Sequence, residues 1–520
     1  MNNSLEYVSR TLKLLQEYMD NTKSQKSIER LATAKYGIHI NEEWANTENG
    51  MIISSTIFKL LVRMVKHIVV FANEEVHSNF KYNAIFTSWL EEAKNQDQDV
   101  SVSFAGTCDV LISLGCNSIL TDIPIDIPTV YVYNNGWEAS VGSSLPPFES
   151  NKSSTNPIGA CLAASLGVAE LFKYALKDIL DAANVRYELH RNLTLSAFAL
   201  QNEPGMDNPD LPDTPNVGIV HMVGAGAIGN AFVHTLASFN NIHGQLLVID
   251  ADIVDLSNLN RYILARKDDI GHCKVDLIKK SLNHTALNVV GFNETWIDFI
   301  QHYGRSLDTV VCTVDSAEAR REIQSDLPRL LLDGATSGFT FSLSSHNFLE
   351  GACLGCIHLP NSNDYAVEEE MARILGWSVG EVFNALRTDH LLNLMEISQI
   401  EAYQQFPQGS LVSFVGKPLR TLWSKELCGR SSINKDQVEY VGTTGFVSII
   451  PGILLAGELI KEVYFKDNVY KGRFIANVLT GPTKHSVQKP EKDSRCGSYC
   501  YDPAMIQAYN IKHTSAYREV

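Results

Sequence analysis

Val217-Gly-Ile-Val-His-Met-Val223-Gly224-Ala-Gly226-Ala-Ile-Gly229 is the stretch of sequence that decides the fold. Its apolar half predicts a buried parallel strand, and the glycine turn predicts the start of a helix. A helical segment over 230–238 and an apolar strand over 245–249 follow, and Asp250 closes that strand. This order is typical of the nucleotide-binding βαβ unit, in which glycines let the backbone approach a phosphate at the helix N-terminus. Asp250, roughly 20 residues past the turn, is placed to accept hydrogen bonds from ribose hydroxyls.

The residues after Asp250 separate this unit from that of a dinucleotide-dependent oxidoreductase. The chain continues Asp250-Ala-Asp252-Ile-Val-Asp-Leu-Ser-Asn258-Leu-Asn-Arg261 and, further on, Asp269-Ile-Gly-His-Cys-Lys274. With this acid, Asn-Leu-Asn-Arg run and Gly-x-x-Lys at these intervals, the segment resembles the adenylating domain of the ubiquitin-activating enzyme superfamily, which includes ThiF, MoeB and HesA. A dehydrogenase has no need for two cations at these positions.

The resemblance implies an ATP site with a magnesium ion. Arg261 and Lys274 would neutralise the roughly four negative charges of ATP and the charge that develops in the transition state. Asp315 follows another apolar strand and matches the family's metal-binding Asp, which has an Arg five residues on, and carboxylate oxygen is the ligand that Mg²⁺ prefers. The family usually has Asn after this Asp, whereas this chain has Ser316. The full set assigned to the nucleotide is Gly224, Gly226, Gly229, Asp250, Asp252, Asn258, Arg261, Lys274 and Asp315, and Arg261, Lys274 and Asp315 are also predicted to be catalytic.

Two pairs of cysteines far apart in the sequence, Cys353-Leu-Gly-Cys356 and Cys496-Gly-Ser-Tyr-Cys500, predict a zinc site. Two such pairs can close a tetrahedral site with Zn–S distances of about 2.3 Å, and four thiolates leave no open position, so the zinc would be structural. The family has this site, built from two Cys-x-x-Cys pairs, and the second pair here departs from it by one extra residue. Ordinary free cysteines are the alternative.

Cys428 is the only other cysteine between the two pairs, in Lys425-Glu-Leu-Cys428-Gly-Arg430. In related proteins the crossover segment after the first zinc pair carries the cysteine that accepts the adenylated tail as a thioester, and we predict this catalytic role for Cys428. Lys425 and Arg430 would lower the pKa of its thiol and favour the nucleophilic thiolate. A buried structural cysteine is the alternative.

The first 200 residues predict a second, degenerate copy of the same domain. Helices over 54–66 and 82–94 alternate with strands over 68–71, 100–104, 109–114 and 129–133, which predicts a parallel sheet with crossover helices. No glycine loop precedes the first of these helices, so we expect this half to be inactive. Segments 156–173 and 451–461 are both small-residue helices that end in Glu-x-x-Lys, which favours a duplication over chance similarity of two Ala-rich helices.

The predicted fold class is therefore α/β, with a Rossmann-like adenylation domain and a mainly parallel sheet. We expect an inactive half over 1–200, a Pro- and Asp-rich linker over 201–216, the active domain over 217–500 and a tail over 501–520. Residues 360–430 would form a helical crossover insertion that carries Cys428. The halves would pair as an intramolecular pseudo-dimer, or the chain as a homodimer, and Arg186 and Arg191 are candidates for an arginine that the inactive half donates to ATP.

Composition narrows the setting in which the chain works. A length of 520 residues suggests two or three domains, and a net charge of −16 disfavours a nucleic-acid surface and suits a basic patch on a protein partner. We find no apolar run of bilayer length and no secretory signal, so we expect a cytoplasmic protein without a membrane partner. Ten cysteines then point to metal binding, catalysis or burial instead of disulfides.

The resemblance implies ATP-dependent activation of the C-terminal glycine of a ubiquitin-like modifier, a thioester on Cys428 and transfer to a separate conjugating-enzyme-like protein. The chain is most similar to bacterial ubiquitin-activating-like proteins of ubiquitin-like conjugation operons, some of them antiphage. One alternative is activation of a sulfur carrier for thiamine or molybdopterin synthesis, and a second is an NAD-dependent oxidoreductase. A third is a scaffold that binds ATP or a modifier without turnover, which would have no need for Gly224, Asp250, Arg261, Lys274 and Asp315 together.

Overall fold

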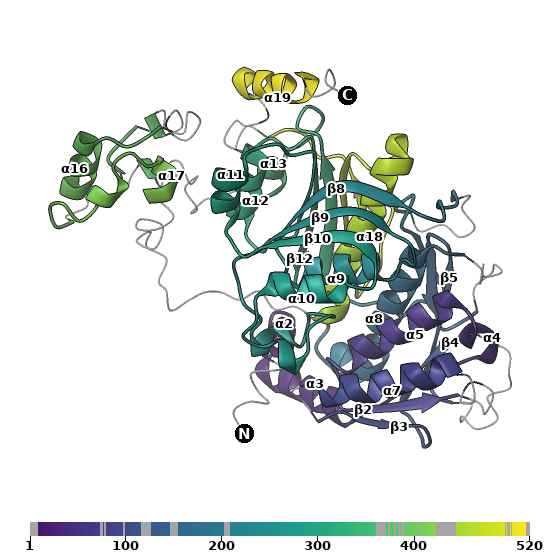
Figure 1. Ribbon diagram of the computed structural model, residues 1–520. Helices are drawn as coiled ribbons and strands as arrows, with labels where there is room; N and C mark the ends of the chain where they lie inside the picture. Colours follow the sequence, from purple (N-terminus) through teal and green to yellow (C-terminus); the bar gives the residue numbers. More distant parts are fainter. Residues whose placement is uncertain are drawn as a thin grey trace.

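The chain forms two α/β halves, each built on one sheet with helices packed against it (Figure 1). The structure is a computed structural model that describes residues 9–72, 76, 80–96, 99–115, 126–145, 154–201 and 208–359, parts of 371–422, and residues 444–493, 496, 500 and 502–515.

The second sheet carries the glycine turn that the sequence singled out. Its strands lie in the order β10-β9-β8-β11-β12-β13-β14-β15. Their bounds are β8 (Asn216–Val223), β9 (His243–Ile249), β10 (Ala286–Phe292), β11 (Thr309–Cys312), β12 (Leu330–Ser337), β13 (Thr340–His346), β14 (Gly472–Asn477) and β15 (Val487–Gln488). The first five of these strands are parallel, and Val223 pairs with both Ile249 and Cys312. Three strands therefore end together at one edge, directly before the predicted nucleotide-binding residues.

The helices of this half follow the alternation that the sequence predicts. They are α9 (Ala227–Ala237), α10 (Lys274–Ser281), α11 (Trp296–Tyr303), α12 (Ala317–Ser325), α13 (Leu354–Ile357) and α18 (Gly445–Tyr464). A last helix, α19 (Pro503–Ser515), lies in the C-terminal segment for which the sequence offered no motif. Tyr509 stacks on Phe348 with ring centroids 5.7 Å apart, and this contact ties α19 to the second half.

The first sheet repeats the strand order of the second. Its order is β3-β2-β1-β4-β5-β6-β7, which matches β10-β9-β8-β11-β12-β13-β14 strand for strand. The strands are β1 (Lys35–Ile40), β2 (His67–Phe71), β3 (Ser101–Ser103), β4 (Val110–Leu114), β5 (Thr129–Asn135), β6 (Glu138–Gly142) and β7 (Leu193–Ser196). Helices α2 (Ser9–Gln16), α3 (Asn21–Thr33), α4 (Glu42–Ala45), α5 (Glu48–Leu61), α7 (Phe80–Lys94) and α8 (Pro157–Ala182) accompany them. The predicted repetition of a Rossmann-like half is confirmed.

Helices α8 and α18 occupy equivalent places in the two halves and pack against each other, since α8 connects β6 to β7 and α18 comes directly before β14, the strand that matches β7. The ring of Phe172 in α8 lies 5.0 Å from that of Phe446 in α18, so the two halves share one apolar core. Among the described helices, α8 alone is long and apolar enough to cross a membrane, but 94% of its most apolar window is buried inside the protein. Such burial is what the core helix of a two-layer fold requires.

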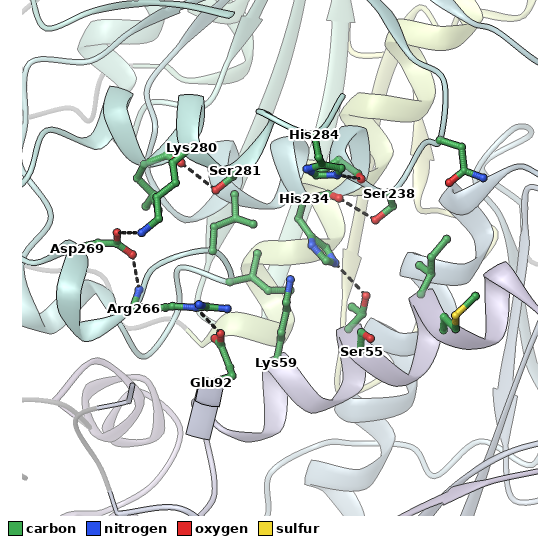
Figure 2. A pocket seen from close by; sticks show the side chains of 18 of the residues that line it. Ser55, Lys59, Glu92, His234, Ser238, Arg266, Asp269, Lys280, Ser281 and His284 are labelled. Atoms are coloured by element: carbon green, nitrogen blue, oxygen red, sulfur yellow. Dashed lines mark hydrogen bonds and ion pairs between the residues drawn. The ribbon is translucent and has the colours of Figure 1, made fainter. Parts of the chain in front are cut away.

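A cavity of about 550 Å³ lies between the halves (Figure 2). Helix α5 of the first half forms one wall, and α9 and α10 of the second half form the other. The predicted helix over 54–66 is this α5, which begins earlier because the Thr47 hydroxyl caps its first turn by accepting a hydrogen bond from the Gly50 N–H at 3.0 Å.

The described parts of the predicted insertion contain α16 (Leu394–Tyr403) and α17 (Leu419–Leu422), with a small apolar cluster of their own. The Gln301 side chain in α11 donates a hydrogen bond to the Thr421 hydroxyl at 3.1 Å, which links the insertion to the second half. Cys428, Lys425 and Arg430 lie outside the described residues. The role predicted for Cys428 therefore stays a prediction.

Candidate nucleotide site and cysteine cluster

The glycine turn connects β8 to α9 and leaves the first turn of that helix open. Gly224 has φ of 93°, a conformation that L side chains rarely adopt, and a Cβ there would lie 3.0 Å from the backbone of Thr313. Gly226 is the N-cap of α9 and provides no side chain to satisfy the N–H groups of the first turn. A Cβ on Gly229 would lie 2.4 Å from the carbonyl oxygen of Gly224, so only glycine fits there. The turn can therefore present backbone N–H groups to a phosphate.

A buried asparagine that the sequence reasoning missed shapes this turn. Asn230 in α9 donates from its amide nitrogen to the carbonyl oxygens of Ala225 and Gly226, at 2.9 and 3.0 Å. Its side chain is fully buried, and its own oxygen has no hydrogen-bond partner among the described residues. The only sequence signal was an Asn directly after the third glycine of the motif.

Asp250 lies where the family pattern places it, at the end of β9 beside the turn. Its carboxylate accepts hydrogen bonds from the N–H groups of Ala225 at 2.6 Å and Asp252 at 2.8 Å. Burial raises the pKa of Asp250, while Lys274 and these two N–H groups act in the opposite direction. The carboxylate thus fixes the conformation of the glycine turn from the side on which a ribose would lie.

Lys274 and Arg261 approach the same edge of the sheet from two different segments. The Lys274 ammonium lies 2.7 Å from the carboxylate of Asp252 and 4.0 Å from that of Asp250. Burial works against the charged form, but Tyr262, Asp250 and Asp252 raise the pKa of Lys274 above its usual value. The Lys274 ammonium and the Arg261 guanidinium lie 5.9 and 5.3 Å from the centre of the Tyr262 ring, so both cations are close to the same aromatic ring.

Arg261 is half-buried and held by the backbone of its own loop. Its guanidinium donates to the carbonyl oxygen of Ser257 and, at 3.4 Å, to the side-chain oxygen of Asn260. Burial lowers the pKa of Arg261 from its usual value. The predicted ligand Asn258 caps the short helix η1 (Leu256–Asn258), because its side-chain oxygen accepts a hydrogen bond from the Asp255 N–H at 2.9 Å. Asn258 thus shapes the loop that positions Arg261.

Asp315 lies just beyond the end of β11, exposed at the edge where β8 and β9 also end. Ser316, where the family usually has Asn, is the N-cap of α12, and its hydroxyl accepts a hydrogen bond from the Ala319 N–H at 3.0 Å. Ser and Asn are both favoured N-caps, so the substitution preserves this function. Asp315 can therefore offer its carboxylate to a hard divalent cation without a change in the backbone.

Arg320, five residues after Asp315, points into the protein. Its guanidinium donates to the carboxylate of Asp333 at 2.8 Å, and the other oxygen of Asp333 lies 3.2 Å from the imidazole of His358. Burial alone would raise the pKa of Asp333, but Arg320 and His358 hold it below its usual value. Asp333 therefore joins the helix that follows Asp315 to the segment that follows Cys356.

The first half reaches this site through residues that the sequence did not identify. Arg10 in α2 is close enough to Arg261 to oppose its charge, while Asp315 favours it. Helix α2 is anchored on the second half because the Tyr18 hydroxyl accepts a hydrogen bond from the Phe339 N–H at 3.3 Å. Arg63, two residues after the end of α5, donates to the carbonyl oxygen of Tyr262 at 2.9 Å and so holds the loop that carries Arg261.

The predicted candidates for such an arginine lie elsewhere. Arg186 and Arg191 are exposed in the segment between α8 and β7. The Arg191 carbonyl accepts a hydrogen bond from the Ser144 N–H at 3.0 Å, within the first half. The first-half arginine that the structure brings near Arg261 is therefore Arg10. In the sequence, Arg10 precedes Arg186 and Arg191 by most of the first half.

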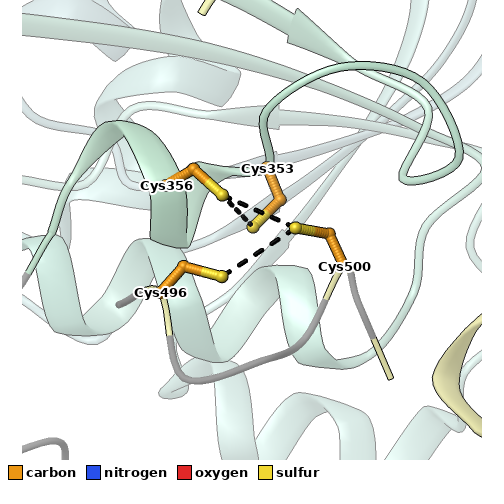
Figure 3. Close-up of side chains that lie close together, drawn as sticks. All are labelled: Cys353, Cys356, Cys496 and Cys500. Carbon is orange, nitrogen blue, oxygen red and sulfur yellow. Dashed lines mark hydrogen bonds between the residues drawn. The ribbon is translucent and has the colours of Figure 1, made fainter. Parts of the chain in front are cut away.

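The four predicted zinc ligands come together in one buried cluster (Figure 3). Sγ of Cys356 lies 3.6 Å from that of Cys353 and 3.5 Å from that of Cys500, and the Sγ atoms of Cys496 and Cys500 are 3.8 Å apart. Thiolates around a tetrahedral zinc ion with Zn–S bonds of about 2.3 Å lie about 3.8 Å from one another. The donor set fits a structural zinc ion, and the extra residue in the second pair does not prevent closure.

The surroundings of the cluster favour the thiolate form of Cys356. The N–H of Asp493 donates to Sγ of Cys356 at 3.2 Å. The side chains of Cys353, Cys496 and Cys500, together with this N–H, lower the pKa of Cys356. The remaining described cysteines, Cys108, Cys161, Cys273 and Cys312, are not in disulfides, and all but the half-buried Cys273 are buried. Their burial agrees with the packing roles expected for structural cysteines.

Comparison with known proteins extends over most of the chain. The ThiF family matches residues 216–498, which begin at β8 and end beside the last cysteine pair. The uncharacterized protein y4jF of Sinorhizobium fredii is 29% identical over 393 residues, which cover 74% of this chain and 75% of that protein.

Two named enzymes match shorter segments. The NEDD8-activating enzyme E1 catalytic subunit of Dictyostelium discoideum is 34% identical over 158 residues, 25% of this chain and 35% of that enzyme. The adenylyltransferase and sulfurtransferase UBA4 of Candida glabrata is 26% identical over 226 residues, 41% of this chain and 50% of that enzyme. The chain thus spans half or less of these named enzymes. With the family match covering more than half of the sequence, the chain belongs to the ThiF family.

Proposed function

We propose that the chain activates the C-terminal glycine of a ubiquitin-like modifier. In the first step, a carboxylate oxygen of the modifier attacks the α-phosphorus of ATP, and the bond to the β-phosphate oxygen breaks to release pyrophosphate. In the second step, the Cys428 thiolate attacks the acyl carbon, a thioester forms and AMP leaves. The modifier then passes to the cysteine of a separate conjugating-enzyme-like protein.

The observation that carries the first step is the convergence of a glycine turn, two cations and an exposed carboxylate at one sheet edge. Membership in the ThiF family and the likeness to two enzymes of modifier and sulfur-carrier activation support adenylyl transfer as the reaction class. An oxidoreductase does not account for two cations, Lys274 and Arg261, close to the ring of Tyr262.

Each residue has a role that follows from its position. The N–H groups at the start of α9 would bind phosphate oxygens, and Asp250 would accept the ribose hydroxyls. Lys274 would exchange its contact with Asp252 for phosphate oxygens, and Arg261 would neutralise the charge on the α-phosphate in the transition state. Asp315 would hold a magnesium ion, which supplies charge neutralisation for the leaving pyrophosphate.

Arg10 adds a contribution from the first half. Its guanidinium acts on Arg261 from a helix that is docked on the second half. We propose that it binds the outer phosphates of ATP, so that the first half completes the site without a glycine loop of its own.

The sulfur-carrier alternative uses the same adenylation and differs only in the fate of the adenylate. The likeness to UBA4 keeps this alternative open, whereas the long insertion before Cys428 favours protein-tail transfer. We also propose that the chain works in the cytoplasm, within a bacterial ubiquitin-like conjugation operon with an antiphage role.

Pyrophosphate exchange into ATP, driven by a β-grasp protein encoded beside the gene, tests the adenylation step. Arg261→Ala and Lys274→Ala should each reduce exchange by about 10²-fold or more, whereas Cys428→Ala should leave it unchanged. Intact-mass analysis without reductant should then detect a thiol-sensitive adduct in the wild type and none in Cys428→Ala. Exchange without an adduct would favour the sulfur-carrier alternative, and exchange unaffected by Arg261→Ala would overturn the assigned site.

A further inference from the structure

The cavity between the halves is separate from the nucleotide site. It lies along α5 and against the far ends of α9 and α10, whereas the nucleotide site lies at the beginnings of α9 and α10 (Figure 2). Its volume of about 550 Å³ is within the range of cavities that bind small molecules. A ligand in this cavity would touch both halves at once.

Lys59 is the unusual residue in this cavity. It extends from α5 toward the helices of the second half, and it is only partly accessible to solvent. Among the residues that the structure describes, none forms a hydrogen bond or an ion pair with the Lys59 ammonium. Burial lowers the pKa of this group, and Arg63 and Arg266 act in the same direction against the attraction of Glu92.

The other charged groups around Lys59 are already paired. Glu92 binds Arg63 at 2.8 Å and Arg266 at 2.7 Å, so the one nearby carboxylate serves two guanidinium groups. On the opposite wall, Lys280 binds Asp269 at 2.9 Å. Removing a cation from water without a counter-ion costs free energy. An anion bound beside Lys59 would offset this cost.

The remaining polar groups of the cavity do not supply this anion. The imidazole of His234 is paired with the Thr56 hydroxyl at 2.9 Å, and that of His284 lies 3.0 Å from the carbonyl oxygen of Ala237. Glu48 is exposed at the beginning of α5, about 16 Å along the helix from Lys59. Water screens a carboxylate at that distance.

Apolar side chains form the rest of the lining. Met51 and Ile52 of α5 lie on one side, and Ile263, Leu264 and Leu277 lie on the other. A fully hydrated inorganic ion would leave these side chains against water, whereas a molecule with an apolar portion would cover them. Within the described part of the chain, the lining therefore combines a cation that has no ion-pair partner, Lys59, with an apolar surface.

We propose that this cavity binds a small carboxylate or phosphate whose anionic group pairs with Lys59 and whose apolar portion packs between α5 and α10. This site is distinct from the ATP site and does not depend on the proposed adenylation reaction. The ligand would hold the two halves together by contacting both.

Thermal unfolding of the whole chain tests the proposal, with phosphate, acetate and hexanoate as probes and sodium chloride at matched ionic strength as the reference. If the cavity prefers a carboxylate with an apolar portion, hexanoate should raise the unfolding temperature more than acetate does. If it prefers a phosphate group, phosphate should raise the unfolding temperature more than either carboxylate does. Lys59→Met keeps the length of the side chain and should weaken the apparent affinity for the preferred probe by at least about tenfold.

Two matched variants identify the site. Lys94→Met, at the exposed end of α7, should respond to the probes as the wild type does. Lys274→Met should keep the response that Lys59→Met loses. A phosphate response that is lost in Lys274→Met and kept in Lys59→Met would come from the nucleotide site and would count against the proposal. Without any probe, Lys59→Met should unfold at a higher temperature than the wild type, since it removes a partly buried cation that has no ion-pair partner among the described residues.

Three results would overturn the proposal. The first is that no probe raises the unfolding temperature above that in chloride. The second is an equal response in Lys59→Met. The third is a lower unfolding temperature of Lys59→Met without probe, which would show that the ammonium already has a stabilising partner.

Discussion

Lys461 in α18 donates a hydrogen bond at 2.8 Å to the backbone carbonyl oxygen of Phe198, a residue of the other half. The equivalent Lys173 in α8 donates in the opposite direction, to the carbonyl oxygen of Leu479 at 3.4 Å. Both acceptors lie two residues beyond the ends of β7 and β14. Each half therefore supplies a hydrogen-bond acceptor to the buried cation of the other, and the Glu-x-x-Lys echo in the sequence marks a reciprocal contact.

Lys461→Met should destabilise the protein. The Lys461 ammonium lies 2.5 Å from the carboxylate of Glu458, and both side chains are fully buried. Removal of the cation leaves an unpaired buried carboxylate, and we expect the free energy of unfolding in urea to fall by about 3–5 kcal/mol. The exposed Lys466→Met is the control, with an expected change of less than about 0.5 kcal/mol.

The double variant Glu458→Gln, Lys461→Met should recover part of this loss, since it removes both charges. Burial already raises the pKa of Glu458 above its usual value. The defect of the single variant should therefore shrink as the pH falls toward the range in which the carboxylate binds a proton. An equal defect in the single and double variants would show that packing, not charge, is lost.

Two of the motif glycines, Gly226 and Gly229, should differ in what they contribute. A Cβ on Gly229 would lie 2.4 Å from the Gly224 carbonyl oxygen, so Gly229→Ala should lower the unfolding temperature even without nucleotide. A Cβ on Gly226 would meet only the Tyr262 hydroxyl, at 3.6 Å, an ordinary contact distance. Gly226→Ala should therefore leave the unfolding temperature unchanged and weaken ATP binding, because it blocks the approach of phosphate to the helix N-terminus.

Calorimetric titration with ATP and thermal unfolding of the free protein separate these two effects. Unfolding at a lower temperature in Gly226→Ala, or normal stability in Gly229→Ala, would contradict the geometry of the turn.

Glu92 should make the stability of the protein sensitive to acid. Burial alone would raise the pKa of Glu92, but Arg63, Lys59 and Arg266 hold it below its usual value of 4.5. The folded chain therefore releases this proton more readily than the unfolded chain. The stabilisation from Glu92 is present above about pH 4.5 and is lost as the pH falls below that value.

Urea unfolding of the wild type and Glu92→Gln between neutral and acidic pH measures this contribution. At pH 7 the variant should be less stable by about 3–5 kcal/mol, because two guanidinium groups lose their buried partner. The difference should narrow below about pH 4.5. A constant difference across the pH range would mean that Glu92 does not titrate differently in the folded and unfolded states.

The cysteine cluster should hold one zinc ion per chain, measurable by metal analysis. Cys496→Ser removes one of four thiolates and should lower both zinc content and unfolding temperature, because metal binding contributes to folding. Cys273→Ser, a half-buried cysteine outside the cluster, should keep the zinc. Full zinc content in Cys496→Ser would exclude Cys496 as a zinc ligand.

Much of the second half could be predicted because its local signals agree with one another. Strand β8 is an apolar run that ends at a glycine turn, and the polar residues follow at family intervals. Strand β1 was not predicted, because Gly37 and His39 interrupt its apolar pattern. In the structure Gly37 is needed, since a Cβ would lie 2.6 Å from the Leu111 side chain on the neighbouring strand.

The contribution of the first half to the nucleotide site could not be predicted from local patterns. Arg10 lies in a short amphipathic helix whose leucines predict only a buried face, and its proximity to Arg261 depends on the packing of the two halves. Arg63 is likewise an ordinary residue at the end of α5 until the loop at Tyr262 is placed beside it. Contacts between segments that are far apart in the sequence leave no periodic pattern from which they could be predicted.

The reciprocal lysines also bear on how a duplicated chain can change afterwards. Because each buried ammonium shares a carbonyl group supplied by its sister half, deletion of either half removes one hydrogen-bond acceptor from the other half and uncovers the apolar core that the two share. The first half can lose its glycine loop and its own chemistry, yet it has to remain folded beside the second. The two hydrogen bonds thus favour retention of the fold of the first half, and they place no requirement on its catalytic residues.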